Sequence, residues 1–220
     1  MDGRRQVRRP GEQRRPQIAA AALELIGQHG LRRFTTPALA RRIRVSDAAV
    51  FRHFPSKRAV VAAVIERVEA LLFEGGLPLD GDPLARLGRF FVRRVARVAA
   101  ERGIARLMFS EELEAVAGRA GAARVAEMKR RSMDFVRACL DEARAAGVLD
   151  PRVGSREGVV LVTGALMALV YGRSAPRPAA IIAREGRRVW AVLEQLLRRR
   201  PRQRRAGGRL PAGKRVRRGR

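Results

Sequence analysis

The chain has 220 residues, and 46% of them are hydrophobic, so it can bury a core and is not a disordered protein. Its 48 Lys and Arg residues outnumber its 21 Asp and Glu residues, which gives a formal net charge of +27. This balance indicates a polyanionic partner, either a nucleic acid or an anionic membrane surface.

The positive charge is unevenly distributed along the chain. Residues 1–15 carry a net charge of +4, residues 198–220 carry +12, and the remaining residues carry +11. We expect residues 1–12 to form a basic disordered arm. The tail, residues 198–220, has no periodic apolar face and is also expected to be disordered. The tail either adds nonspecific DNA affinity or is a solvated segment without a selected role.

A first helix is predicted from about residue 13 to residue 28. Gly30 follows it, where a left-handed glycine favours the end of a helix. We expect this helix to pack across two short helices that follow, and the arginines before it to reach DNA as a basic arm. Its apolar face is formed by Ile18, Ala22, Leu25 and Ile26.

Residues 34–54 predict two short helices separated by a tight turn. Thr36 is the expected cap of the first helix, and Pro37 suits the first position because the missing N–H would have no partner there. Ser46 is the expected cap of the second helix. Asp47 in the first turn suits the positive end of the helix dipole. The two predicted caps therefore define a helix-turn-helix.

The second short helix has the dimensions of a recognition helix for the DNA major groove. Val50 and Phe54 lie four residues apart on its core face, so small and hydrogen-bonding side chains remain outside. We expect Arg52 and His53 to reach base edges or nearby phosphates, and Lys57 to anchor a phosphate. The full set expected at double-stranded DNA is Thr35, Thr36, Ser46, Asp47, Ala48, Ala49, Phe51, Arg52, His53 and Lys57. The alternative is a helical hairpin with a solvated basic face.

The stretch resembles the helix-turn-helix of the TetR family of bacterial transcriptional regulators (TetR/AcrR type), and the resemblance covers about residues 14–73. Two positions depart from the family pattern. Arg44 replaces the turn glycine, where a left-handed non-glycine residue costs about 1 kcal/mol. Phe51 replaces the usual tyrosine and has no hydroxyl for a phosphate. The matching positions are Thr35 and Thr36, Ala40, Val45 and Ser46, Phe51, Phe54, and Ser56 with Lys57.

The resemblance implies an all-α fold of about nine helices. Residues 13–75 would form a three-helix DNA-binding domain, with the helix-turn-helix at about 35–54, and residues 76–197 a helical ligand-binding and dimerisation domain. It also implies a ligand-responsive repressor that binds a palindromic operator as a homodimer. One alternative is an architectural or nucleoid-associated DNA-binding protein without a small-molecule effector. The other is a membrane-surface protein held by its basic ends.

The pattern after residue 75 is helical without a strand signal. Residues 75–82 are rich in Gly and Pro, which places the domain boundary there. Asp82 and Pro83 form a cap and first position for the next helix. The later predicted helices run from about residue 83 to 103, 104 to 116, 121 to 146, 156 to 173 and 179 to 197.

Met and aromatic side chains at helical spacing are candidates for a pocket that takes an unknown small apolar or amphipathic effector. The same spacing is more often found in an ordinary core. The candidate pocket residues are Met108, Phe109, Met128, Phe135, Met167 and Tyr171.

Residues 156–173 are apolar nearly all round, so this helix must be covered on more than one side. The resemblance implies that the last two helices pair with those of a second copy, whereas a monomeric bundle could bury the same stripes. The candidate interface residues are Leu166, Val170, Val189, Trp190, Leu193 and Leu197.

Enzyme chemistry has little support. His29 and His53 are the only histidines, and no Gly-rich phosphate loop appears, so no catalytic residue, metal site or cofactor is expected. Cys139 is the only cysteine and is predicted to be a buried structural thiol rather than a redox sensor.

No segment reads as a signal peptide or a membrane span. The first fifteen residues lack an apolar stretch, and the longest uncharged run, residues 158–172, is shorter than the ~20 residues that span a bilayer. We therefore expect a cytoplasmic, nucleoid-associated protein without membrane insertion.

Overall fold

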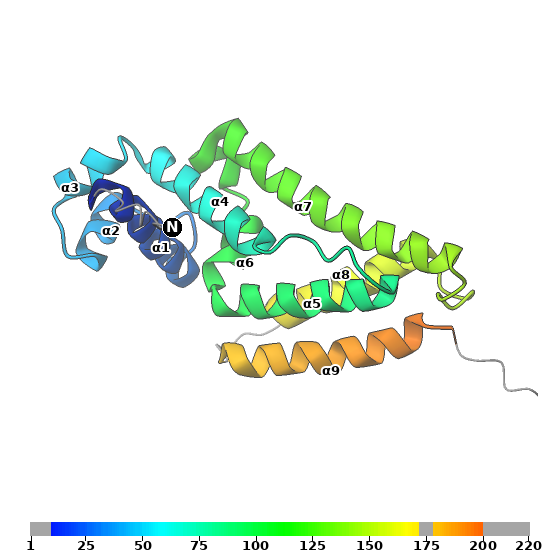
Figure 1. Ribbon diagram of the computed structural model, residues 1–220. Coiled ribbons are helices and arrows are strands. Elements are labelled where there is room, and N and C mark those ends of the chain that lie inside the picture. Colours follow the sequence, from blue (N-terminus) through cyan, green and yellow to red (C-terminus); the bar gives the residue numbers. More distant parts are fainter. Residues whose placement is uncertain (1–9, 172–177, 200–220) are drawn as a thin grey trace, which may run out of the picture.

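The computed structural model describes residues 10–171 and 178–199 (Figure 1). Their regular structure consists of nine helices, so the predicted all-α fold is confirmed. The predicted arm lies outside the described residues up to residue 9, and its last three residues begin the first helix instead of being disordered. The predicted tail lies outside them from residue 200, whereas Arg198 and Arg199 are ordered through hydrogen bonds to Asp82 and the Val148 carbonyl. The helices are α1 (Pro10–His29), α2 (Thr36–Arg42), α3 (Asp47–His53), α4 (Lys57–Phe73), α5 (Pro83–Ala100), α6 (Arg102–Met108), α7 (Leu113–Ala145), α8 (Ser155–Tyr171) and α9 (Ala179–Leu197).

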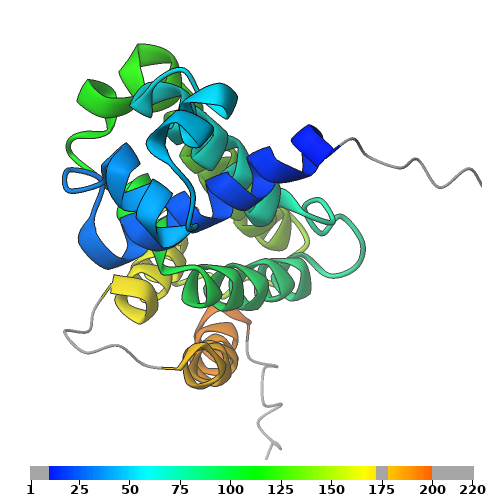
Figure 2. The same ribbon diagram turned by 90° about the vertical axis from the view of Figure 1, so that its left-hand side faces the viewer.

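Helices α1 to α4 form one end of the molecule, at left in Figure 1. Helix α1 packs against α4 and lies across both short helices, as predicted. Figure 2 looks at this end and shows α9 end-on, so α9 runs along the long axis of the molecule. Phe34, Leu39, Val50 and Phe54 are buried where α2 and α3 meet α1 and α4.

The core of this end extends beyond the predicted domain boundary. Ile104 and Leu107 of α6, together with Leu113 and Val125 of α7, are buried in the same cluster as the side chains of α1 to α4. Helix α6 lies directly on the backbone of α1, because a methyl group added at Gly103 would lie 2.1 Å from the Leu23 carbonyl oxygen. The end formed by α1 to α4 and the second half are therefore packed together through α6.

A second core lies between α5, α7, α8 and α9. The Phe91 and Trp190 rings are 5.6 Å apart, and Trp190 approaches the α5 backbone at Gly88, where an added methyl group would lie 2.3 Å from Nε1. Only glycine allows this approach. Cys139 is buried in this core, as predicted, and burial raises the pKa of its thiol to about 11.

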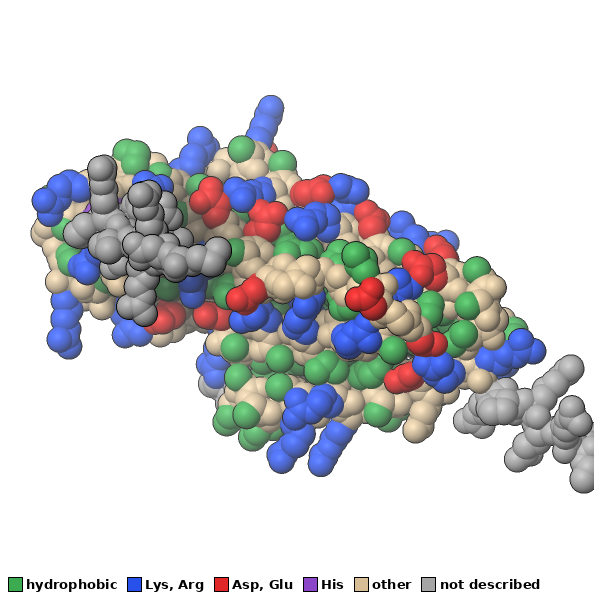
Figure 3. Space-filling view, in the orientation of Figure 1, with side chains coloured by type: hydrophobic (Ala, Val, Ile, Leu, Met, Phe, Trp, Pro, Cys, Tyr) green, Lys and Arg blue, Asp and Glu red, His purple; other side chains and the backbone are tan. Residues whose placement is uncertain are grey.

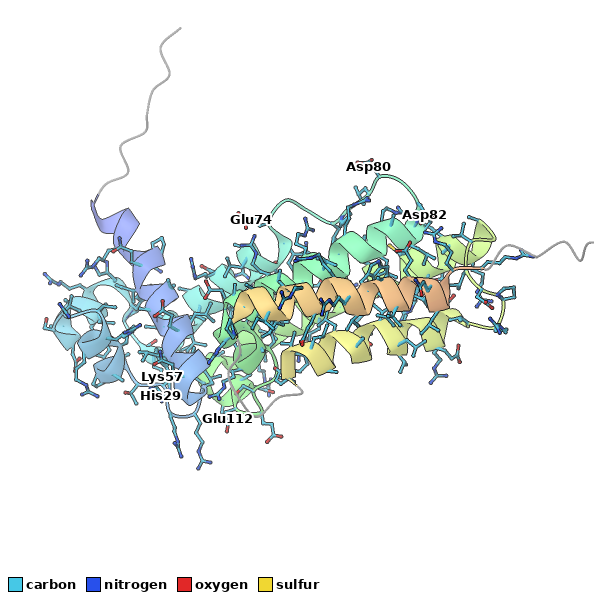
Figure 4. All side chains as sticks on the ribbon, turned by 90° about the horizontal axis from the view of Figure 1, so that it is seen from below. His29, Lys57, Glu74, Asp80, Asp82 and Glu112 are labelled. Atoms are coloured by element: carbon cyan, nitrogen blue, oxygen red, sulfur yellow. The ribbon has the colours of Figure 1, made fainter. Side chains whose placement is uncertain are left out.

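Helices α8 and α9 lie side by side on the lower face of the molecule (Figures 1 and 4). The far end of α9 is tied to the start of α5, since the Arg198 guanidinium donates to the Asp82 carboxylate at 3.0 Å. Figure 4 shows Asp82 beside that end of α9. Asp82 also caps α5 by accepting from the Ala85 amide at 2.9 Å, which confirms the predicted cap.

The helix predicted at about 104–116 is wrong in its extent. Helix α6 ends at Met108, and α7 already begins at Leu113. The expected break before residue 121 is reduced to a kink at Gly118, which has φ 73° inside α7. A glycine can take that angle without strain, so the chain bends once and the helix continues. None of the helices in residues 10–171 and 178–199 is long and apolar enough to cross a membrane.

Candidate nucleic-acid interface

Helix α2 begins at a threonine cap. Thr35 has an extended backbone, and its Oγ1 accepts a hydrogen bond from the Ala38 amide at 3.3 Å. The cap is therefore Thr35 rather than the predicted Thr36, which is the first helical residue. Both threonines were expected near DNA, and the correction concerns only which of them caps the beginning of the helix. Pro37 lies in the first turn, where no N–H donor is needed.

The turn between α2 and α3 is closed by two backbone hydrogen bonds. The Val45 amide donates to the Ala40 carbonyl at 3.0 Å, and the Arg44 amide donates to the Arg41 carbonyl at 3.2 Å. These bonds satisfy carbonyls at the end of α2 and require a left-handed residue between them. Arg44 takes that position with φ 56°, and no other non-glycine residue among those described has a positive φ. Arg44 thus occupies the turn position at which the helix-turn-helix pattern given above has glycine.

Helix α3 presents one face to the core and the other to solvent. The Ser46 Oγ accepts from the Ala49 amide at 3.2 Å, so the predicted cap is confirmed. Val50 and Phe54 are completely buried. Arg52 is exposed, and Phe51 is 45% exposed, which is unusual for a large apolar side chain.

A side chain from α1 holds the end of α3 in place. Arg15 donates to the His53 carbonyl at 2.9 Å, and its guanidinium lies 4.5 Å from the centre of the Phe54 ring. Sequence reasoning did not single out Arg15 as a site residue. The available signal was its place as the last arginine before the apolar face of α1. Arg15 therefore holds the end of α3 against α1.

The beginning of α4 lies beside the same end. Ser56 caps it by accepting from the Ala59 amide at 3.2 Å. The Lys57 Nζ lies 5.9 Å from the centre of the Phe34 ring, and no described carboxylate pairs with it. Lys57 is therefore half-buried at its base while its charge remains available to an anion.

The ten residues predicted at DNA all lie on α2, α3, their caps or the first turn of α4. None of them is buried. Lys and Arg side chains project around this end of the molecule in Figure 3. The exposed members are Thr35, Ser46, Asp47, Ala48, Phe51 and Arg52, and the half-buried members are Thr36, Ala49, His53 and Lys57.

A cavity of about 290 Å³ lies in the second half of the molecule, between α4, α5, α6, α7 and α8. Four of the six predicted pocket residues line it, and two do not. Met128 is buried in the core of the DNA-binding end, and Phe135 packs against Phe90 with ring centres 5.0 Å apart. The four lining residues are Met108, Phe109, Met167 and Tyr171.

Three hydroxyl groups of the cavity wall donate to backbone carbonyls. Ser132 donates to Met128 at 2.9 Å, Thr163 donates to Val159 at 2.7 Å, and Tyr171 donates to Ala105. Burial raises the pKa of Tyr171 above its usual value. The cavity also includes two cationic side chains that sequence reasoning did not identify, Arg94 and Lys129.

Of the six residues predicted at a dimer interface, three are buried inside the protomer and three are partly covered by it. Leu166 and Val170 line the cavity. Val189 is half-buried against the second core. Trp190, Leu193 and Leu197 are at most 7% exposed and face the interior of the protomer, because this stripe of α9 packs on α5.

The opposite stripes of α8 and α9 expose apolar side chains to solvent. Val160 and Leu161 on α8 are 65% and 44% exposed, and Val192 and Leu196 on α9 are 58% and 55% exposed. Figure 3 shows hydrophobic side chains gathered around α9 at the lower edge. We refer to these four residues as the α8–α9 face. None of these four residues is among the six predicted at a dimer interface.

The described residues contain no group of three His, Cys, Asp or Glu side chains that could hold a metal ion.

Residues 18–64, from α1 into α4, match the family described as bacterial regulatory proteins, tetR family. These residues contain the complete helix-turn-helix.

Two curated proteins and one solved structure extend the comparison. Nucleoid occlusion factor SlmA of Mannheimia succiniciproducens is 40% identical over 63 residues, which are 28% of this chain and 29% of that protein. An uncharacterized HTH-type transcriptional regulator of Mycobacterium bovis is 35% identical over 91 residues, 41% of this chain and 45% of that protein. The chain thus covers less than half the length of either relative.

The structure of AibR in complex with isovaleryl coenzyme A and operator DNA has the same fold, with a TM-score of 0.66 and 17% identity over 83% of this chain and 97% of that chain. The shared fold has an N-terminal helix-turn-helix followed by a helical second part. The match to the tetR family of bacterial regulatory proteins covers residues 18–64, and for the rest of the chain the likeness to AibR shows the fold alone.

Proposed function

We propose that the protein is a sequence-specific DNA-binding transcriptional regulator, a ligand-responsive repressor that binds a palindromic operator as a homodimer. The observation that carries this proposal is the geometry of α3. Its inner face is buried through Val50 and Phe54, while Asp47, Ala48 and Arg52 are exposed on its outer face. A short, firmly held helix with an unoccupied outer face suits insertion into the major groove.

We propose that α3 and the beginning of α4 contact different parts of the DNA. Arg52 and His53 would reach base edges or adjacent phosphates. Lys57, which has no carboxylate partner among the described residues, would hold the DNA backbone. Arg15 would keep the exit of α3 at a fixed distance from α1. Residues 1–12 and 198–220 would add contacts that do not depend on sequence.

Ligand response is supported by the position of α6. Ala105 and Met108 line the cavity, while Gly103, at the other end of this short helix, lies against the Leu23 carbonyl of α1. A ligand that displaces α6 would therefore act on the helix that supports α3. We propose residues 13–75 as the DNA-binding domain and residues 76–197 as the regulatory domain, with α6 and α7 sharing the core of the first.

Dimerisation is supported by the α8–α9 face. Four large apolar side chains from two adjacent helices are exposed there, and a twofold interface would cover them with their counterparts. The resulting pair of α3 helices would read two half-sites of a palindrome about one helical turn, or a small multiple of one turn, apart.

A second candidate function is favoured by one observation. The similarity to SlmA, which is named a nucleoid occlusion factor, supports an architectural or nucleoid-associated DNA-binding role without a small-molecule effector. Both candidates place the protein on the chromosome. They differ in whether the cavity has a ligand that releases DNA.

Selection of binding sites from random duplexes at near-physiological salt tests the proposal. Full-length protein and a variant lacking residues 198–220 should enrich the same palindrome, and the truncated variant should show a shallower dependence of affinity on salt. Release of the selected duplex by metabolites then separates the two candidates. Failure to enrich a motif, with binding that disappears when the tail is removed, would contradict both.

A further inference from the structure

One wall of the cavity contains a buried cation without a counter-ion. Arg94 of α5 is 8% exposed, and its guanidinium lies between two rings, 4.9 Å from the centre of Phe90 and 5.0 Å from that of Phe73. Its Nη2 atom is buried and has no hydrogen-bond partner. An unpaired buried charge is costly, so a structure that keeps one needs a reason to do so.

The electrostatic surroundings of Arg94 are positive. Burial, followed by the charges of Arg93 and Arg131, lowers the pKa of Arg94 to about 10, so the side chain is still cationic at neutral pH. Two stacked aromatic faces stabilise the cation but satisfy none of its N–H donors. The group that would best complete this site is an anion with oxygen acceptors.

A second cation lines the same cavity. Lys129 of α7 places its Nζ 4.4 Å from the centre of the Phe109 ring, and burial lowers its pKa. No carboxylate of the described residues pairs with it. Among the described residues that line the cavity there is also no Asp or Glu. The cavity surface itself is apolar, because Arg94 and Lys129 border it through their carbon atoms, and the two positive charges lie behind this surface.

Arginines near Arg94, unlike Arg94 itself, form ion pairs with carboxylates. Arg97 pairs with Glu74, and Arg131 pairs with Glu69 at 3.1 Å. Glu69 also pairs with Arg124 at 2.7 Å. The region thus has carboxylates, and they neutralise the cations outside the cavity. Arg94 and Lys129 are left for a partner that comes from outside the chain.

We infer that the cavity binds a small organic monocarboxylate whose carboxylate accepts hydrogen bonds from Arg94, with Lys129 as a second positive charge and the apolar tail against Met108, Phe109 and Met167. The inference rests on the proposed ligand-responsive function and names the chemistry of its ligand. A cavity of about 290 Å³ is near the lower end of the usual range for ligand pockets, ~300–1,000 Å³. The enclosed part of the ligand is therefore compact.

Calorimetric titration of the full-length protein tests this chemistry. The probes are hexanoate, octanoate, decanoate, benzoate and phenylpropanoate, each compared with its primary amide, which has a similar shape and no charge. The wild-type protein should bind at least one carboxylate about tenfold or more tightly than the matching amide, because hydrogen bonds to charged groups are stronger than neutral ones.

Two arginine variants on the same helix provide the comparison. Arg94→Met should remove the preference for the carboxylate while keeping an apolar side chain of similar length. Arg97→Met, which removes a paired cation outside the cavity, should leave the preference unchanged. Since Arg94 is an unpaired buried charge, the ligand-free Arg94→Met protein should melt no lower than wild type. If it fails to fold, Lys129→Met should still reduce the preference.

The measurement separates this inference from the proposed function. Arg94-dependent binding of a carboxylate that does not release operator DNA would support the inference and contradict ligand-responsive repression. Release by a neutral compound, with no binding of any carboxylate in the series, would overturn the inference and leave repression intact. Equal affinity for a carboxylate and its amide, or an unchanged preference in Arg94→Met, would also overturn the inference.

Discussion

The amide of Val45 donates to the carbonyl of Ala40 at 3.0 Å, and this hydrogen bond fixes the angle at which α3 leaves α2. Arg44, which lies between these two residues in the chain, has the strained backbone angle φ 56°. Glycine would adopt this angle without a Cβ clash. The backbone hydrogen bond, and not the Arg44 side chain, therefore sets the geometry of the turn.

Arg44→Gly should raise the free energy of unfolding by up to about 1 kcal/mol, since the relief of strain exceeds the extra flexibility of glycine in the unfolded chain. Urea denaturation followed by circular dichroism measures this change. Arg44→Ala is the matched control, because it removes the same charge and retains a Cβ. Equal stability of the two variants would mean that φ at this position is not strained.

Lys57→Ala should weaken binding to all DNA sequences alike, because we expect Lys57 to contact a phosphate. Arg52→Ala and Ala49→Gln should instead change which operator is preferred, by about 1–3 kcal/mol of discrimination. Competition binding against a panel of operator variants distinguishes the two effects. An unchanged site profile for both α3 variants would show that α3 does not read bases.

Phe51→Tyr should tighten DNA binding. The ring is 45% exposed on the outer side of α3, so an added hydroxyl can point into solvent or toward a phosphate without disturbing the core. The affinity of wild type and variant for the selected duplex is compared at one salt concentration. Phe51→Leu is a useful control that changes the exposed apolar group without adding a donor. No gain with tyrosine would indicate that the backbone is out of reach.

Leu196→Glu should give a folded monomer that binds DNA poorly, because Leu196 is 55% exposed on the α8–α9 face. Leu193→Glu should instead destabilise the protomer, since Leu193 is only 7% exposed and would bring a charge into the second core. Sedimentation and thermal melts of both variants separate loss of dimer from loss of fold. A Leu196→Glu protein that remains dimeric at micromolar concentration would move the interface elsewhere.

The sequence was informative wherever local chemistry determines structure. The caps at Ser46 and Asp82 each depend on a short polar side chain three residues before its amide partner, and both were predicted. The four-residue spacing of Val50 and Phe54 was enough to orient α3. Local patterns of this kind require no knowledge of the rest of the fold.

The misplaced predictions depend on distant contacts. Helix α9 has apolar side chains on two faces, and only the position of α5 decides that Leu193 faces inward and Leu196 outward. Arg94 and Lys129 look like solvated charges in the sequence, because Phe73, which covers Arg94, lies on α4, and Phe109, which lies beside Lys129, precedes α7. Arg15 likewise acquires its role only when α1 crosses α3.

The core shared by α1 to α4, α6 and the first half of α7 has a consequence for any attempt to isolate the DNA-binding end. A fragment that stops near residue 75 would expose Leu23 of α1 and Ile65 of α4, which now lie against α6 and α7. Such a fragment should aggregate or behave as a loosely packed ensemble. In the intact chain, backbone amides of α1, α6 and early α7 should exchange with solvent together, as one cooperative unit.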